Sequence, residues 1–241
     1  GHVHMMDPGY TDREDFTKGT RAAARGGVTT VIDHHRTKPQ VFGAKELLEK
    51  KEYLKTRSVV DFGLLGGLSL TNLANLKGLW EEGALGFKGF TCELHEAEAL
   101  GMGNLMEILS EIRKFDGIAL FHCEDDSLLK KAEERLRKEG RKDRLTVSEW
   151  RSPEAEEVAV RNLIYAAKKT GARVAVAHTS LPALVLAQAA ARAQGVSIYT
   201  ETCPQYLCLT EEDLESKGPF AKFTPPPRKK EEVEKMRWCL G

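Results

Sequence analysis

The sequence predicts an α/β fold built on a sheet of parallel strands. Short apolar runs rich in β-branched residues alternate with longer segments of helical periodicity. Runs this short and apolar are typical of strands that are buried on both faces of a parallel sheet. Repeated strand–helix units with right-handed crossovers leave two architectures open, a doubly wound sheet and a (β/α)8 barrel.

In the first half of the chain, glycines and β-branched residues mark where helices end and strands begin. The run His2-Val-His4 is the first predicted strand. The segment 15–25 is a predicted helix that ends at Gly26-Gly27, and the β-branched run 28–32 follows it as a strand. Two more helix–strand pairs follow the same pattern, with helices at 44–54 and 73–82 and strands at 59–65 and 84–90.

The second half repeats the pattern. The helix 104–115 precedes the strand 118–122, and Gly171 and Gly195 end two further helices. Those helices cover 153–170 and 182–194, the strands after them cover 173–178 and 197–201, and a last helix covers 229–238. The mixed-charge stretches 130–144 and 228–237 are interpreted as solvated helix faces. Residues 1–241 are therefore expected to form one domain of seven strand–helix units.

Composition excludes several classes of function. Lysines and arginines number 36 and so do aspartates and glutamates, so no net charge favours nucleic acid or an acidic membrane. No apolar run approaches the ~20 residues that span a bilayer. The five cysteines are an odd number and form no CxxC pair, which favours a reducing compartment. We therefore expect a cytoplasmic protein that binds neither nucleic acid nor membrane.

Histidines at strand ends point to a metal site. His2 and His4 lie two residues apart, so in a strand both rings face the same side and can share one divalent metal. His122 and His178 each end a predicted strand. Four histidines at the ends of three strands are hard to explain by packing, because barrel enzymes place their chemistry at the C-terminal ends of strands.

Lys88 is the second unusual residue, because it lies inside an apolar run that should be buried. A buried ammonium is costly, so such a lysine deprotonates or pairs. A neutral lysine can react with carbon dioxide and give a carbamate whose two oxygens could bridge two metals. Taken alone, Lys88 is better explained as a strand-end side chain that reaches water.

Other polar residues near these strands have weaker signals. Asp33 and His35 end the strand at 28–32 and could orient ligands or line a pocket, although structural hydrogen bonding explains them equally well. Glu124 follows His122 by two residues and could hold that ring in place. His95, in the loop after Lys88, is expected to be exposed.

The combination of an HxH pair, a strand lysine and two strand histidines resembles the binuclear amidohydrolases. Within that family, the opening His2-Val-His-Met-Met-Asp-Pro-Gly9 resembles the HVHxxEPG motif of allantoinases and dihydroorotases. Similarity to allantoinases continues over almost the whole chain, in segments 63–68, 86–90, 151–161, 201–207 and 223–228. The chain is thus similar to the cyclic amidohydrolases.

The resemblance implies a distorted (β/α)8 barrel of the metal-dependent hydrolase kind, carrying two divalent metal ions, most simply zinc. By resemblance His2 and His4 bind one metal, Lys88 bridges as a carbamate, and His122 and His178 bind the second. The implied reaction is hydrolysis of a cyclic amide or ureide ring by a metal-bridging hydroxide. Allantoinase-like activity is the first reading, and the alternatives are dihydroorotase, hydantoinase or dihydropyrimidinase activity, or a non-catalytic scaffold.

Three positions depart from the family pattern. Met6 stands where dihydroorotases carry an arginine for the substrate carboxylate. Gln205 replaces a histidine that is common in allantoinases, and His34-His35 replaces a usual Met-Pro. These differences bear on the ring substrate and leave the predicted metal ligands unchanged.

The resemblance also implies parts that are not in these 241 residues. The family's catalytic Asp belongs to an eighth strand, which would follow the helix 229–238, and flanking segments form a small β-sandwich. We therefore predict no catalytic residue in this chain. Residues 1–241 alone are expected to be poorly soluble and inactive, whereas the longer enzyme, expected to be a homo-oligomer, turns over its small cyclic substrate.

Overall fold

The computed structural model describes residues 1–94 and 97–240 of the chain. Two compact units make up the chain. The first contains Gly1–Gly89 and Glu107–Leu120, and the second contains Phe90–Met106 and Phe121–Gly241. Helix α4 (Met102–Arg113) and strand β5 (Ile118–His122) contribute residues to both units.

Parallel strands form the centre of the first unit. These are β1 (His2–Val3), β2 (Thr30–Asp33), β3 (Asp61–Gly67) and β4 (Gly86–Phe90), the last residue of which belongs to the second unit. Each pairs in parallel with the next, and the register places Val3 opposite Asp33 and Gly67 opposite Lys88. The strand that carries His2 and leads to His4 is therefore fixed against the end of β2.

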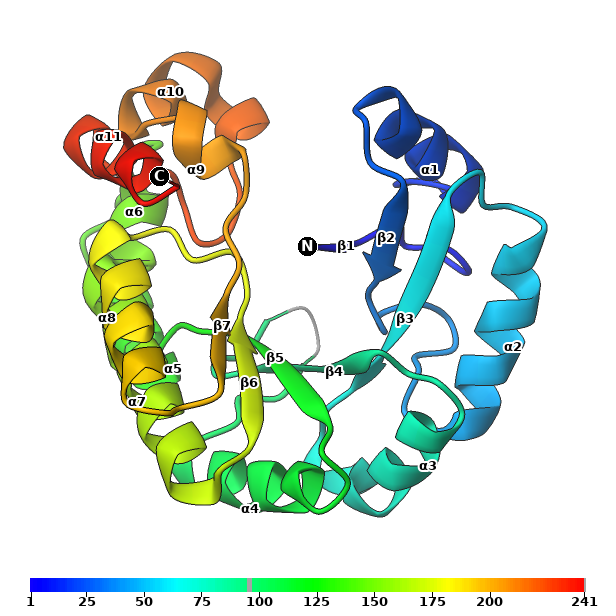
Figure 1. Cartoon of the computed structure of the whole chain (residues 1–241). Coiled ribbons are helices and arrows are strands. Elements are labelled where there is room, and N and C mark those ends of the chain that lie inside the picture. Colours follow the sequence, from blue (N-terminus) through cyan, green and yellow to red (C-terminus); the bar gives the residue numbers. More distant parts are fainter. Residues whose placement is uncertain (95–96, 241) are drawn as a thin grey trace. The chain divides into compact units, whose positions relative to one another are not determined.

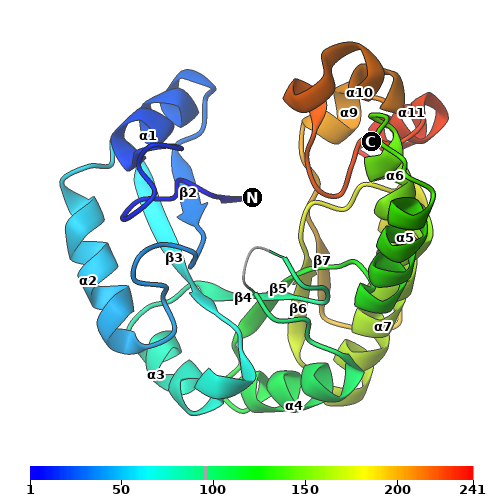
Figure 2. The same cartoon turned by 180° about the vertical axis from the view of Figure 1, so that it is seen from behind.

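Helices line one side of these strands, as Figures 1 and 2 show for the blue and cyan part of the chain. They are α1 (Phe16–Arg25), α2 (Ala44–Lys55), the short 3-10 segment η1 (Leu70–Asn75) and α3 (Leu76–Glu81). Helix α1 begins at Phe16 because the Asp15 carboxylate accepts the Lys18 N–H at 2.8 Å. Phe16 is fully buried and packs edge-on against Phe62 of β3, which fixes the helix on the strands.

The second unit contains β6 (Arg173–Val176) and β7 (Ile198–Thr200), paired in parallel. The Ala177 N–H donates to the Phe121 carbonyl, so the end of β6 is tied to the end of β5. The remaining elements of this unit are helical. They are α5 (Asp126–Lys138), α6 (Thr146–Trp150), α7 (Pro153–Thr170), α8 (Pro182–Ala193), α9 (Gln205–Cys208), α10 (Glu211–Lys217), the 3-10 segment η2 (Gly218–Ala221) and α11 (Lys230–Trp238).

Helix α7 shows how sequence signals set these elements. Its first residue is Pro153, and Gly171 ends it with φ 69°, a left-handed conformation that glycine adopts without strain. Its buried face carries a stripe of small and apolar residues, including Ala159, Val160 and Leu163. Helices α7 and α8 lie on the same side of β6 and β7 (Figure 1).

The predicted α/β class with parallel strands is confirmed. Several predicted strands are too long. The strand at 84–90 begins at Gly86, the strand at 173–178 ends at Val176, and the strand at 197–201 covers only Ile198–Thr200. His178 has φ 39°, which takes the chain out of the extended conformation. Among the described helices, none is both long and apolar enough to cross a bilayer.

Candidate metal centre

The histidines of the first unit lie close together at the ends of β1 and β2. The ring centroids of His2 and His4 are 5.3 Å apart. His34 stacks on His4 at 4.0 Å and on His35 at 4.3 Å. His34 follows β2 directly, and its N–H donates to the Val3 carbonyl at 3.0 Å, so strand pairing itself brings the rings together. The HxH pair thus belongs to a group of four imidazoles.

Lys88 belongs to the same group. All five residues of β4 are buried, and only 1% of Lys88 is exposed. The pKa of His34 lies well below its usual value because of burial, and the charges of His4, His35, Lys88 and His2 lower it further. His34 is therefore neutral. A buried lysine beside neutral imidazoles suits a site that receives positive charge from a metal and negative charge from a bridging anion.

A buried ion pair holds the chain that follows β1, where His4 lies. One oxygen of Asp33 accepts the Met5 N–H at 3.0 Å, and the other lies 2.7 Å from the Lys50 ammonium. Lys50 also donates to the His34 carbonyl at 2.6 Å. Burial lowers the pKa of Lys50, and the Asp33 carboxylate opposes this shift. Asp33 thus orients the chain next to His4.

The burial of His35 predicts a pH dependence of stability. Burial, with the charges of Lys50, Lys88 and Arg36, lowers the pKa of His35 from 6.5 to about 3. Between pH 6.5 and 3 the imidazole of His35 takes up a proton in the unfolded chain but not in the folded one. The contribution of neutral His35 to the unfolding free energy is therefore complete above pH 6.5 and is lost as the pH falls toward 3. Between pH 7 and 5 the unfolding free energy of His35→Phe should therefore fall by about 2 kcal/mol less than that of the wild-type protein. Urea unfolding at both pH values measures this, and an equal loss in both proteins would contradict it.

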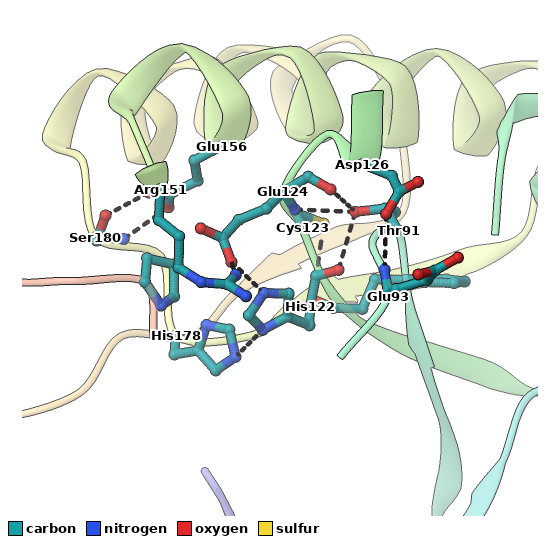
Figure 3. A network of polar contacts seen from close by, with 12 residues as sticks. Thr91, Glu93, His122, Cys123, Glu124, Asp126, Arg151, Glu156, His178 and Ser180 are labelled. Carbon is teal, nitrogen blue, oxygen red and sulfur yellow. Dashed lines mark hydrogen bonds and ion pairs between the residues drawn. The ribbon is translucent and has the colours of Figure 1, made fainter. Parts of the chain in front are cut away.

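In the second unit, His122 and His178 face each other (Figure 3). The Nδ1 atom of His122 lies 3.1 Å from Nε2 of His178. Two nitrogens that bind one zinc ion at ~2.0–2.1 Å and near-tetrahedral angles lie about 3.3–3.4 Å apart. The hydrogen bond between the two rings therefore brings these nitrogens close to the separation of ligands that share a metal.

The contact with Glu124 determines which ring nitrogen of His122 can bind a metal. Its carboxylate lies 2.5 Å from Nε2 of His122. Burial opposes ionisation of Glu124, but the hydrogen bond with His122 and the charges of His122, Arg151 and Arg228 lower its pKa. An ionised carboxylate only accepts, so Nε2 of His122 carries a proton, and in the neutral ring Nδ1, which faces His178, has the lone pair.

The backbone around His178 is also held. Its N–H donates to a carboxylate oxygen of Glu201 at 3.1 Å, and the Thr179 N–H donates to the Glu201 carbonyl at 2.7 Å. The Ser180 N–H donates to Glu156 at 2.8 Å. A non-glycine residue with positive φ is strained, and such strain persists only where surrounding contacts fix it.

A second donor set in this unit is a poorer metal site. Cys92, His122 and Glu124 are buried with their ligand atoms within 4.8 Å of one another. However, burial and the nearby Glu124 charge raise the pKa of the Cys92 thiol to about 12, so without a metal the thiol is protonated. The guanidinium of Arg151 already pairs with Glu124 and supplies positive charge there. A cation is better placed at the other side of the His122 ring.

The structure thus brings the sequence-predicted residues together within each unit. His2, His4, Lys88, Asp33 and His35 lie in the first, and His122, Glu124 and His178 lie in the second. His95 lies outside the described residues. The sequence reasoning missed a set of buried charged residues that support these groups, namely Lys50, Arg151, Glu156 and Arg228.

Comparison with known proteins places this geometry in a family. The model of the amidohydrolase family matches residues 1–218. An allantoinase of Streptomyces avermitilis is 35% identical over 230 residues, which are 94% of this chain and 51% of that enzyme. An L-hydantoinase of Paenarthrobacter aurescens is 31% identical over 233 residues, covering 95% of this chain and 51% of the relative. The chain spans about half the length of the curated relatives it matches.

Solved structures show the same fold. The structure of an L-hydantoinase (dihydropyrimidinase) from Arthrobacter aurescens superposes with a TM-score of 0.94 and 30% identity, over 98% of this chain and 53% of that one. A D-hydantoinase structure gives a TM-score of 0.88 at 26% identity. The predicted fold class, the α/β barrel of the metal-dependent hydrolases, is confirmed. With a family match over most of its length, the chain belongs to the amidohydrolase family.

Proposed function

We propose that the protein carrying this chain hydrolyses the ring of a cyclic amide, with allantoin-like ureides as the first candidate substrates. The proposed ligands of two divalent metal ions are His2, His4, Lys88, His122 and His178. The observation that carries the proposal is the 3.1 Å approach of His122 Nδ1 to His178 Nε2, with Glu124 bound to Nε2 of His122, so that Nδ1 is the unprotonated nitrogen of the neutral ring.

The donor set fits such metals. Neutral imidazoles suit zinc and its neighbours in the first transition series, and a carbamate on Lys88 would add a hard anionic oxygen donor. When bound, the metals would supply hydroxide at neutral pH and polarise the ring carbonyl. The supporting residues keep the ligands ready for this, because Glu124 fixes the His122 tautomer and Asp33 fixes the chain beside His4.

The choice of ring rests on the relatives and on Met6. Allantoinases support a ureide ring, and the L-hydantoinase relatives make a hydantoin or dihydropyrimidine the second candidate. Met6 is apolar and 5% exposed, so it offers no cation for the carboxylate of dihydroorotate. Zinc as the metal, a carboxylated Lys88, a homo-oligomeric assembly and a cytoplasmic location stay predictions from the sequence.

Metal analysis and a substrate panel test the proposal. We expect the full protein to contain about two divalent metal ions per chain and to lose turnover when a chelator removes them. Assays with allantoin, hydantoin, dihydrouracil and dihydroorotate should show turnover of at least one of the first three. A protein that binds no metal and hydrolyses none of the four would favour the non-catalytic scaffold instead.

A further inference from the structure

One buried arginine contacts both segments that carry the histidines of the second unit. Arg228 ends the proline loop 223–228 and is 2% exposed. Its Nε donates to the Ser180 hydroxyl at 2.8 Å, one terminal nitrogen donates to the Arg151 carbonyl at 2.8 Å, and the other to Glu156 at 3.0 Å. The three nitrogens of the guanidinium are thus directed at three different groups.

The first contact leads to His178. Ser180 lies two residues beyond that histidine, and both its N–H and its hydroxyl donate to Glu156 (Figure 3). Glu156 and Ser180 are both contacts of Arg228. Because His178 has a positive φ, the position of its ring depends on how firmly the next residues are held.

The second contact leads to His122. Arg228 binds the carbonyl of Arg151, whose guanidinium pairs with Glu124. Glu124 in turn binds Nε2 of His122. The path from Arg228 to the His122 ring therefore consists of buried hydrogen bonds and the buried ion pair of Arg151 with Glu124. Both arginines have a carboxylate partner, since Arg228 itself pairs with Glu156.

We propose that Arg228 is a positioning residue that sets the separation of His122 Nδ1 and His178 Nε2, and thereby the affinity for the metal they share. This inference rests on the proposed function. Arginine suits the role because its planar fork directs several donors at fixed angles, whereas a lysine offers one flexible ammonium. A purely structural role would stabilise the fold and leave metal binding unchanged.

The test is cobalt binding by the full protein and its Arg228→Lys and Ser180→Ala variants. Competition with a chelator gives the affinity of each cobalt ion, and the visible absorption bands report the geometry of its ligands. For Arg228→Lys we expect one of the two cobalt ions to bind about 10- to 100-fold more weakly, with shifted bands. Ser180→Ala should change the same ion in the same direction, and it carries the test if Arg228→Lys does not fold.

Tyr206→Phe is the matched control. Its hydroxyl is buried and donates to the Pro225 carbonyl at 2.7 Å, so the variant loosens the same proline loop without touching the contacts of Arg228. We expect lower stability with unchanged cobalt affinity and bands. If both Arg228→Lys and Ser180→Ala bind cobalt with wild-type affinity and absorption bands, the inference is wrong and the proposed function still stands. An equal loss of cobalt affinity in Tyr206→Phe would have the same consequence. A wild-type protein that binds no cobalt would overturn the inference and the proposed function together.

Discussion

Replacement of Lys88 by Ala is expected to remove metal and activity together. We expect the loss of at least one metal ion per chain and a fall in turnover of at least about 10²–10³-fold, the loss seen when a charge-stabilising group is removed. The reason is that Lys88 is 1% exposed and lies beside neutral imidazoles, where a charged ammonium is unfavourable. When deprotonated, its amine can add to carbon dioxide, forming an N–C bond and releasing a proton, which leaves a carbamate anion on Lys88.

Rescue distinguishes this role from simple packing. Acetate or propionate can enter the space left in Lys88→Ala and supply a carboxylate, so both should restore part of the metal content and turnover. Lys50→Ala is the matched control, because Lys50 is another buried lysine of the same unit, already paired with Asp33. That variant should lose stability, and short carboxylic acids should not restore it. Full metal content and turnover in Lys88→Ala would rule out the bridging role.

The strands and helices near the candidate site follow local signals that a sequence displays. Helix α7 has the predicted bounds 153–170, because Pro153 and Gly171 mark its two ends. The short segments α9 and α10 were not predicted, since four to seven residues show little periodicity. The positive φ of His178 was also missed, because it is imposed by contacts with Glu201 and not by its neighbours in the chain.

Some of the supporting charges could have been found from the sequence. Lys50 lies in the buried stripe of α2 with Leu47 and Leu54, and Glu156 lies in that of α7 beside Ala155 and Ala159. A charged residue within an apolar helical stripe predicts a buried partner. The sequence does not show which residue this partner is, since Arg228 is 72 residues from Glu156 and 77 from Arg151. Such pairings depend on the folded chain.

Removal of Glu124 is the second change for which we expect a large effect. Its carboxylate is fully buried and pairs with Arg151, whose side chain is 3% exposed. Glu124→Ala leaves a buried guanidinium without its carboxylate, so the unfolding free energy should fall by about 3–5 kcal/mol. Glu157→Ala on the same unit is the control. Its pair with Arg161 is exposed, so that change should cost only about 0–1 kcal/mol.

The double variant Glu124→Ala/Arg151→Met separates stability from metal binding. Without the guanidinium no charge is left uncompensated, so urea unfolding should show most of the lost stability restored. Metal affinity should stay about 10- to 100-fold below wild type, because no carboxylate then holds the proton on Nε2 of His122 and Nδ1 is protonated part of the time. Recovery of metal affinity along with stability would mean that Glu124 serves only to neutralise Arg151. Persistent weak binding in a stable protein would assign to Glu124 the control of the His122 tautomer.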